Sequence, residues 1–350
     1  MPKLSVERTV TQTKKAVLGG LLRYNNEKMG KQKYKRFAIS LRQGDEIVGG
    51  VVGEVWTAVL FIQLFWLEQR FRSKGFGAKL IKAIEDEARR FGATQSYVDT
   101  MSFQAPGFYR YKVGSFECTS INDGARSFPM PDKFVVNVPK EEALAAADAV
   151  YMPKGMVTVP FNPQLINTGS KLVLIDTGNG VANLEPSKGA VGRTLQNLQA
   201  AGVDPKSIDI VLLSHLHPDH TNGIRLADGG LAFPNAEIMV PVKDWEFWES
   251  DENAAKAPNE MTKNYFANVK KTFAGLESKV TKYEWGKEVA PGITSIATPG
   301  HTPGHTSFAV ASGDKKVLIQ SDVTNIPEFF LRNPDWHVMF DTDPAMAQET

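Results

Sequence analysis

Five of the six histidines of this chain fall in two short segments, HLHPDH at residues 215–220 and GHTPGH at residues 300–305. Imidazole is a common ligand of Zn²⁺ and similar ions, and four ligand-type side chains within six residues are hard to explain by packing. The two segments therefore predict a metal site.

The first segment is able to serve two ions. Residues two apart at the end of an extended chain point the same way, so His215 and His217 can face one ion. Pro218 then turns the chain, which lets Asp219 and His220 reach a second ion close by. The apolar residues just before this segment predict a buried strand that ends at the site.

The remaining ligands are expected from other strand ends. His301 lies in a loop rich in Gly, Pro and Thr, just before a predicted strand at 307–311. Asp322 follows an apolar strand at 317–320. Its separation from His301 in the sequence is long enough for a β-hairpin that brings the two residues back together. A carboxylate in that place can bridge two cations.

Taken together, these segments resemble the metallo-β-lactamase superfamily across about residues 111–350. The resemblance implies an α/β fold, an αββα sandwich, with Asp176 as a buried supporting carboxylate and His305 beside the ligands rather than among them. It implies six metal ligands, which are His215, His217 and His301 for the first ion, Asp219 and His220 for the second, and Asp322 bridging both.

The resemblance also implies a last histidine ligand beyond a further helix and strand, and the sequence stops at Thr350 before them. We therefore expect a C-terminally truncated sandwich in which the second ion is held more weakly. An inactive fragment stays open as an alternative.

Two ions of the Zn²⁺ type lower the pKa of a shared water towards 7, which supplies metal-bound hydroxide without a protein nucleophile. Asp219 is expected to orient this hydroxide and to receive its proton.

Residues 161–169 and the aromatic insert at Trp245, Phe247 and Trp248 look most like the lactonase, arylesterase and organophosphate-hydrolase group. This implies an ester or lactone substrate, with organophosphates as a further class, while core or dimer contacts would explain the aromatic side chains equally well.

A second pattern lies near the start of the chain. A β-branched and aromatic run at 55–67 predicts a buried strand, and apolar residues at helical spacing predict a helix from about 78 to 91. Between them stands RSKGFGA, residues 72–78. Such a turn presents main-chain N–H groups at the positive end of a helix dipole, where glycine lets a phosphate come close. A tight turn that needs positive φ explains the glycines equally well.

With a strand that ends in DTMSF, residues 99–103, and the segment QAPGFY at 104–109, this turn resembles the GCN5-related N-acetyltransferases, the GNAT family, over about residues 1–114. The resemblance implies acetyl-CoA, an amine acceptor, and Tyr109 as the proton donor on the family's fourth helix. It implies six residues around the coenzyme pyrophosphate, which are Arg72, Lys74, Gly75, Phe76, Gly77 and Ala78. The strands that complete the family's sheet do not follow Gly114, so we expect an incomplete GNAT-like mixed α/β sheet.

Composition and charge agree with two joined domains. The chain has 350 residues, 42% hydrophobic and 23% charged, as in soluble globular proteins. Residues 1–108 hold 18 Lys and Arg against 10 Asp and Glu, whereas residues 109–350 hold 22 against 29. We therefore expect a GNAT-like acetyl-CoA-binding domain at 1–110 and a metallo-β-lactamase-fold hydrolase domain at 111–350.

The sequence also narrows the compartment and the partners. One cysteine, Cys118, and the lack of a signal peptide or a membrane-length apolar run predict a cytoplasmic protein without a membrane partner. The acidic metal half has no basic stripe, which disfavours nucleic acid as a partner. A homodimer stays open.

Three functions remain. The first is a metal-dependent hydrolase of esters or lactones fused to a shortened acetyltransferase. The second is an acetyl-CoA-dependent N-acetyltransferase with an inert metal half. The third is a non-catalytic fusion fragment.

Overall fold

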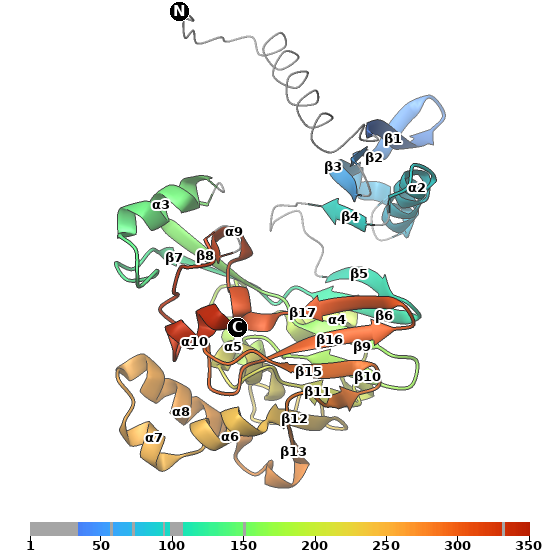
Figure 1. Ribbon diagram of the computed structural model, residues 1–350. Coiled ribbons are helices and arrows are strands. Elements are labelled where there is room, and N and C mark those ends of the chain that lie inside the picture. Colours follow the sequence, from blue (N-terminus) through green and yellow to red (C-terminus); the bar gives the residue numbers. More distant parts are fainter. Residues whose placement is uncertain are drawn as a thin grey trace, which may run out of the picture. The chain divides into compact units, whose positions relative to one another are not determined.

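The computed structural model divides by its internal contacts into two compact units, residues 1–104 and 105–350 (Figure 1). The residues that the structure describes are 34–56, 59–71, 74–93, 95–98, 108–149, 152–330 and 333–350. Arg72, one of the predicted coenzyme-binding residues, lies outside them. None of the helices in these segments is long and apolar enough to cross a membrane.

The first unit is a four-stranded sheet with one helix. Its strands stand in chain order, β1 (Tyr34–Gln43), β2 (Glu46–Trp56), β3 (Val59–Leu67) and β4 (Gln95–Val98). The first three are antiparallel to one another, and α2 (Phe76–Arg90) connects β3 to its parallel neighbour β4. Leu80, Ile84 and Ala88 are buried on one face of α2, within the apolar cluster that contains Val51 and Leu60 of the sheet.

The single strand that we expected at 55–67 is wrong. Residue 56 ends β2 and residue 59 begins β3, and the two strands pair as an antiparallel hairpin. The run is apolar on both sides of the hairpin and contains neither Gly nor Pro at the turn, so its composition does not distinguish one strand from two. The predicted helix is present, and Gly92 follows its end with φ 88°.

The second unit is built on a seven-stranded sheet. Its order is β13 (Val280–Tyr283), β12 (Glu237–Pro241), β11 (Ile210–Leu212), β10 (Leu172–Ile175), β9 (Gln164–Asn167), β6 (Phe116–Ile121) and β5 (Phe108–Val113). The four strands from β10 to β13 are parallel, and the other pairs are antiparallel. Parallel strands end at a common edge, so the segments that follow β10, β11 and β12 meet there.

A second sheet packs on one face of the first. It is antiparallel, in the order β14 (Glu288–Ala290), β15 (Ile293–Ala297), β16 (Thr306–Ser312) and β17 (Lys315–Ile319). Val173 and Ile175 of β10 share one apolar cluster with Ile293 and Phe308 of this sheet. The side chain between them, Leu174, belongs to a different cluster on the opposite face, as strand alternation requires.

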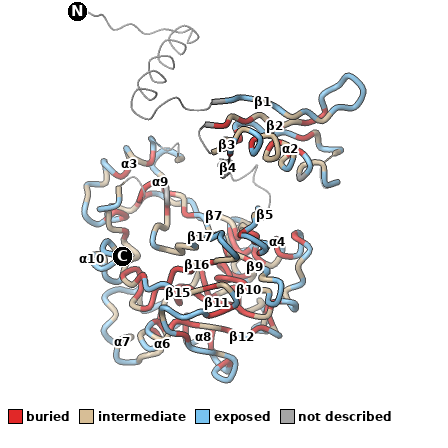
Figure 2. Tube along the Cα trace, turned by 45° about the vertical axis from the view of Figure 1, so that its right-hand side comes forward, coloured by how far each residue is buried: buried red, intermediate tan, exposed pale blue. Residues whose placement is uncertain are grey.

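Helices cover that opposite face. Side chains of α4 (Thr194–Ala200), α6 (Val242–Trp248) and α8 (Glu260–Phe273) complete the cluster around Leu174. The buried parts of the tube accordingly follow the central strands in Figure 2. The mixed α/β class and the sandwich core that we expected are confirmed.

A smaller layer stands beside the sandwich. The two-stranded sheet of β7 (Gly124–Pro129) and β8 (Met156–Phe161) packs with α3 (Lys140–Ala149), α9 (Pro327–Phe330) and residues 338–340 in a third apolar cluster. The remaining α-helices are α5 (Pro218–Thr221), α7 (Asp251–Ala255) and α10 (Pro344–Glu349). This layer forms one wall of the cavities at the metal-binding segments.

Candidate metal centre and coenzyme turn

The predicted ligands lie where strands end. His215 follows β11, and the short helix α5 begins directly after His217. His301 stands in the connection from β15 to β16, and Asp322 lies in a 3₁₀ turn, Ser321–Thr324, after β17. Segments far apart in the sequence therefore supply side chains to one edge of the sandwich.

Three of these histidines form one group. The ligand atoms of His215, His217 and His301 all lie within 4.8 Å of one another, and all three side chains are buried. Nδ1 of His217 is 3.0 Å from Nε2 of His301. Burial, followed by the neighbouring imidazoles, holds the pKa of His215 and of His217 well below the usual histidine value. Both rings are therefore neutral at pH 7 and offer a lone pair to a cation.

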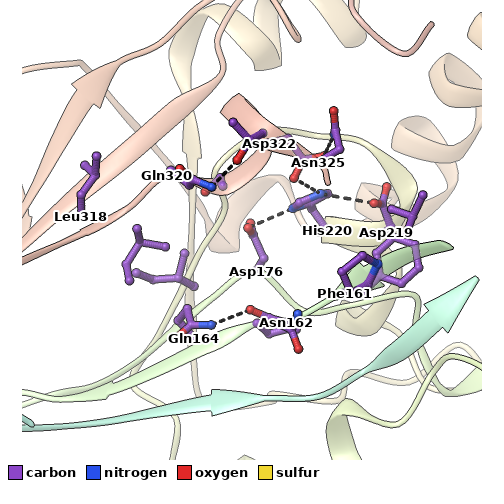
Figure 3. Close-up of a pocket in the computed structure, with 17 residues that line it drawn as sticks. Phe161, Asn162, Gln164, Asp176, Asp219, His220, Leu318, Gln320, Asp322 and Asn325 are labelled. Carbon is purple, nitrogen blue, oxygen red and sulfur yellow. Dashed lines mark hydrogen bonds and ion pairs between the residues drawn. The ribbon is translucent and has the colours of Figure 1, made fainter. Parts of the chain in front are cut away.

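A second group shares His215. The ligand atoms of His215, His220 and Asp322 also lie within 4.8 Å of one another. Nε2 of His220 is 3.3 Å from Oδ1 of Asp322 and 3.4 Å from Oδ2 of Asp219 (Figure 3). The other oxygen of Asp322 is 3.5 Å from Nε2 of His301. The two oxygens of Asp322 thus face the two groups, as a bridging carboxylate must.

Carboxylates change the charge of the remaining histidines: Asp341 and Asp322 outweigh burial and raise the pKa of His301 in the first group. Burial lowers the pKa of His220, but the carboxylates of Asp176, Asp322 and Asp219 outweigh burial and raise it well above the usual value. Burial raises the pKa of Asp322, but His220 and His301 outweigh it and lower the pKa. Without a metal, the protonated His220 ring therefore forms ion pairs with the carboxylates around it. A bound cation could replace that proton as the positive charge of the cluster.

The donor set fits a divalent cation of the Zn²⁺ type. It combines imidazole nitrogens with carboxylate oxygens, which are the ligands that Zn²⁺ takes in proteins. Nε2 of His215 and Nε2 of His220 are buried, and within the described part of the chain neither has a hydrogen-bond partner. A buried polar atom without a hydrogen bond is costly, so a bound cation would satisfy Nε2 of His215 and would replace the ion pairs of His220 Nε2 with Asp219 and Asp322.

Asp176 supports the second group from the end of β10. Its carboxylate accepts hydrogen bonds from the main-chain N–H of Ser214 at 2.8 Å and from the Ser214 hydroxyl, and lies 2.9 Å from Nδ1 of His220. A carboxylate at Nδ1 fixes the ring so that Nε2 points into the group. Asp176 has φ 60°, an uncommon value for a residue other than glycine.

His305 lies beside the candidate ligands and belongs to neither group. Its Nδ1 is 2.9 Å from the carbonyl oxygen of Thr298, and its Nε2 accepts the main-chain N–H of Asp322 at 3.0 Å. Both ring nitrogens are thus engaged, and burial lowers the pKa of His305 to about 3. The neutral ring holds the main chain of Asp322 in place.

Sequence reasoning missed two carboxylates. Asp341 lies 2.9 Å from Nδ1 of His301, and Asp244 accepts main-chain N–H groups from Leu216 and Gly304. Neither residue belongs to a motif with a fixed spacing to its partner. The only signal for Asp244 is its place in the first turn after β12, a place that acidic residues commonly take for reasons of helix capping.

Three cavities open at the centre. The largest, about 410 Å³, reaches His217, Asp219, His301 and Asp322, and its other walls include the apolar side chains Phe128, Phe161, Tyr265, Met339 and Phe340. Another, about 330 Å³, reaches Asp176, His220 and Asp322 past Asn162, Gln164 and Gln320 (Figure 3). The third, about 210 Å³, lies next to His217 under α7 and α8.

The aromatic insert packs in the core, and two of its three side chains also line a cavity. Trp248 and Phe247 line the third cavity, and the ring centroid of Trp248 lies 5.5 Å from that of His217. Trp245 packs against Phe273 in the apolar cluster under the sheet. All three aromatic side chains pack in that cluster, and Trp248 itself is only 1% exposed.

The predicted coenzyme turn stands at the N-terminus of α2 in the first unit. Gly75 caps the helix with φ 78°, which favours glycine, and Phe76, Gly77 and Ala78 form the first turn. Lys74 is exposed just before them. These residues place main-chain N–H groups at the start of a 15-residue helix, as the sequence pattern predicted.

Tyr109 does not lie on a helix, and the expectation of one there is wrong. It is in β5, opposite Ser120 of β6 in the seven-stranded sheet of the second unit, and its ring stacks on Tyr111. Residues 108–113 are mostly aromatic or β-branched, which favours a strand over a helix. Its role as a proton donor stays a prediction.

Comparison with known proteins identifies both halves. The model of the metallo-β-lactamase superfamily matches residues 162–349, and that of the GNAT acetyltransferase family matches residues 14–114. The chain belongs to the metallo-β-lactamase superfamily, and a GNAT region precedes that part. Its second unit is a hydrolase of the metallo-β-lactamase fold.

Individual relatives agree with this division. Acetyltransferase Atu2258 of Agrobacterium fabrum is 33% identical over 109 residues, which are 30% of this chain and 80% of that protein. An N-acyl homoserine lactonase of a Bacillus species is 26% identical over 219 residues, 58% of this chain and 79% of the lactonase.

Two solved structures extend the comparison. AbOPH, a hydrolase of the β-lactamase superfamily, has a TM-score of 0.63 and 31% identity, over 70% of this chain and 84% of its own. AidC, a dizinc quorum-quenching lactonase, has a TM-score of 0.63 and 27% identity, over 69% and 83%.

Proposed function

We propose that the second unit hydrolyses esters or lactones with the help of two divalent cations of the Zn²⁺ type. The observation that carries this proposal is the pair of ligand groups that share His215 and open on a cavity of about 410 Å³ with largely apolar walls. His215, His217 and His301 would hold one cation, Asp219 and His220 the other, and Asp322 would bridge.

When bound, such cations polarise a scissile carbonyl and make hydroxide available near neutral pH. The chain's own residues then have separate tasks. Asp219 would orient the attacking water and take its proton, a role supported by its carboxylate, which lines two of the cavities and lies next to His220 Nε2. The apolar walls exclude water from the rest of the substrate and bind its hydrocarbon part.

Among carbonyl substrates, we expect lactones to be preferred. Two of the relatives above are lactonases by name, and one of these is described as dizinc. The largest cavity combines apolar side chains with Asn179 and Asn222, whose amides suit the polar atoms of an acylated lactone ring. Organophosphate triesters are a further candidate class, because the same two cations would polarise a phosphoryl oxygen.

The test uses the full chain, loaded with Zn²⁺ and assayed on N-acyl homoserine lactones, aryl esters and a phosphotriester. We expect lactone turnover that a chelator abolishes and added Zn²⁺ restores. Asp219→Asn should lower kcat by at least about 100-fold, as loss of a general base does, whereas Lys154→Gln, an exposed position that lines none of the three cavities, should not. Bound metal below one equivalent together with no chelator-sensitive turnover would refute the proposal.

We also propose that the first unit binds acetyl-CoA and transfers its acetyl group to an amine. The observation that favours this is the glycine-capped start of α2, together with the likeness to an acetyltransferase over 80% of that protein's length. The test is calorimetry of the full chain with acetyl-CoA, and an assay for free thiol with a panel of amines. Binding should survive His215→Ala and weaken with Gly77→Asp, and an absence of heat at millimolar acetyl-CoA would contradict it.

A further inference from the structure

Asp244 is a carboxylate that none of the roles above uses. It lies in the first turn of α6, directly after β12, and its side chain is fully buried. Its carboxylate accepts two main-chain N–H groups, and the Thr302 side chain and the charge of His301 also act on it. Burial of a carboxylate costs folding free energy unless both its oxygens accept hydrogen bonds. A buried Asp244 therefore indicates a structural or functional role for this side chain.

The two N–H groups belong to the two segments that supply the first group of ligands. Oδ2 accepts the N–H of Leu216 at 2.8 Å, and Leu216 stands between His215 and His217. Oδ1 accepts the N–H of Gly304 at 2.7 Å, three residues after His301. One carboxylate therefore spans two loops that are 88 residues apart in the chain.

The contact with Gly304 is too close for any other residue. A Cβ at Gly304 would lie 2.2 Å from the main-chain nitrogen of Asp244 and 2.8 Å from its Cα. Both obstacles are main-chain atoms, which cannot rotate away. The loop after His301 is thus pressed against the start of α6 at the point where the carboxylate binds it.

The negative charge of Asp244 also suits a position near a cation site. Burial raises the pKa of the Asp244 carboxyl by more than its hydrogen bonds and the neighbouring His301 lower it. A cation among His215, His217 and His301 would add positive charge to that of His301, which already favours the ionised carboxylate. The carboxylate and the cation would then stabilise each other through the loops that separate them.

We propose that Asp244 is a positioning residue for the three-histidine group, which aligns the loop of His215 and His217 with the loop of His301 and so sets the affinity of the first cation. This inference rests on the proposed metal site. Asp244 does not contact the cation itself and acts through Leu216 and Gly304.

The test measures metal binding and not turnover, so that its failure can be separated from failure of the proposed function. Full-length wild type and Asp244→Asn are titrated with Zn²⁺ against a chromophoric chelator and with Co²⁺ by visible absorption. The asparagine keeps one acceptor oxygen and turns an NH₂ group towards the other N–H. We expect one of two cations to bind 10- to 100-fold more weakly, while the other keeps its affinity.

Two control variants separate positioning from stability. Asp123 is equally buried and accepts N–H groups from Asn179, Gly192 and Thr194, none of which lies in the ligand loops. Asp123→Asn should lower the melting temperature of the metal-free protein and leave both affinities unchanged. Asp176→Asn should weaken the cation at His220 and not the one that Asp244→Asn weakens.

A measurement on the unchanged protein covers the case in which Asp244→Asn does not fold. Hydrogen exchange at Leu216 and Gly304 should be slow already in the metal-free protein, because the carboxylate holds both amides. Fast exchange at these two amides would overturn the inference, as would wild-type affinity for both cations in a folded Asp244→Asn. A wild type that binds no metal would instead refute the metal site itself.

Discussion

Asp176→Asn is the substitution whose effect follows most directly from the structure. The aspartate carboxylate accepts two hydrogen bonds from Ser214 at 2.8 Å and lies 2.9 Å from Nδ1 of His220. An asparagine of the same shape keeps one oxygen, which the main-chain N–H of Ser214 can occupy. Its NH₂ group then faces the N–H of the His220 ring, where two donors meet.

The magnitude follows from the charge that is lost. A hydrogen bond to a charged group contributes about 1.5–3 kcal/mol, against about 1 kcal/mol for a neutral pair. The ring of His220 is then free to turn, and the carboxylate no longer raises its basicity. Loss of such a support lowers metal affinity about 10- to 100-fold, which is about 1.4–2.7 kcal/mol and agrees with the first range.

The assay is metal competition with a chelator, combined with Co²⁺ absorption and ¹⁵N spectra of the histidine rings. We expect the cation at His220 to weaken by this factor, the three-histidine cation to be unchanged, and the Nδ1–H signal of His220 to move upfield as its strong acceptor is lost. The reasoning is refuted if both cations bind with wild-type affinity, or if the three-histidine cation is the one that weakens.

Other substitutions and conditions test the surroundings. His305→Ala leaves two buried groups unpaired and should lower the free energy of unfolding by about 1–3 kcal/mol in a denaturant titration. Leu174→Ala removes a fully buried side chain and should lower it by about 2–5 kcal/mol. In metal-free protein, His305 has a pKa of about 3 when folded against 6.5 when unfolded, so between these values the unfolded chain binds a proton that the folded chain does not. Stability should therefore fall on acidification below pH 6.5, by up to about 1.4 kcal/mol per pH unit from this group alone, and His215 and His217 act in the same direction. Stability by denaturant titration that stays level or rises from pH 6.5 to 4.5 would contradict this.

The sequence marks the candidate ligand segments because their chemistry is local. HLHPDH places four ligand-type side chains within six residues, and an apolar strand before it fixes where the segment stands. His301 and Asp322 lie at the ends of a hairpin, so strand prediction alone brings them towards each other. Local spacing and strand ends are the two signals that a single sequence carries well.

The supporting groups could not be predicted for the opposite reason. Asp244 and Asp341 act through contacts between residues that are far apart in the chain, and a single carboxylate has no spacing that marks its partner. The strand error at 55–67 and the helix error at Tyr109 have a related cause, because short apolar or aromatic runs do not reveal where a turn lies or which sheet they join.

The sheet order explains why the supporting carboxylates come from where they do. The strands stand as β12, β11 and β10 and run parallel, so the strand that leads to His215 lies between two neighbours that end at the same edge. Asp176 follows one neighbour and binds the N–H of Ser214, and Asp244 follows the other and binds the N–H of Leu216. The main chain of His215 is therefore held from both sides. The two carboxylates differ in what else they bind, because Asp176 also reaches His220 of the second group, whereas Asp244 also binds the loop of His301.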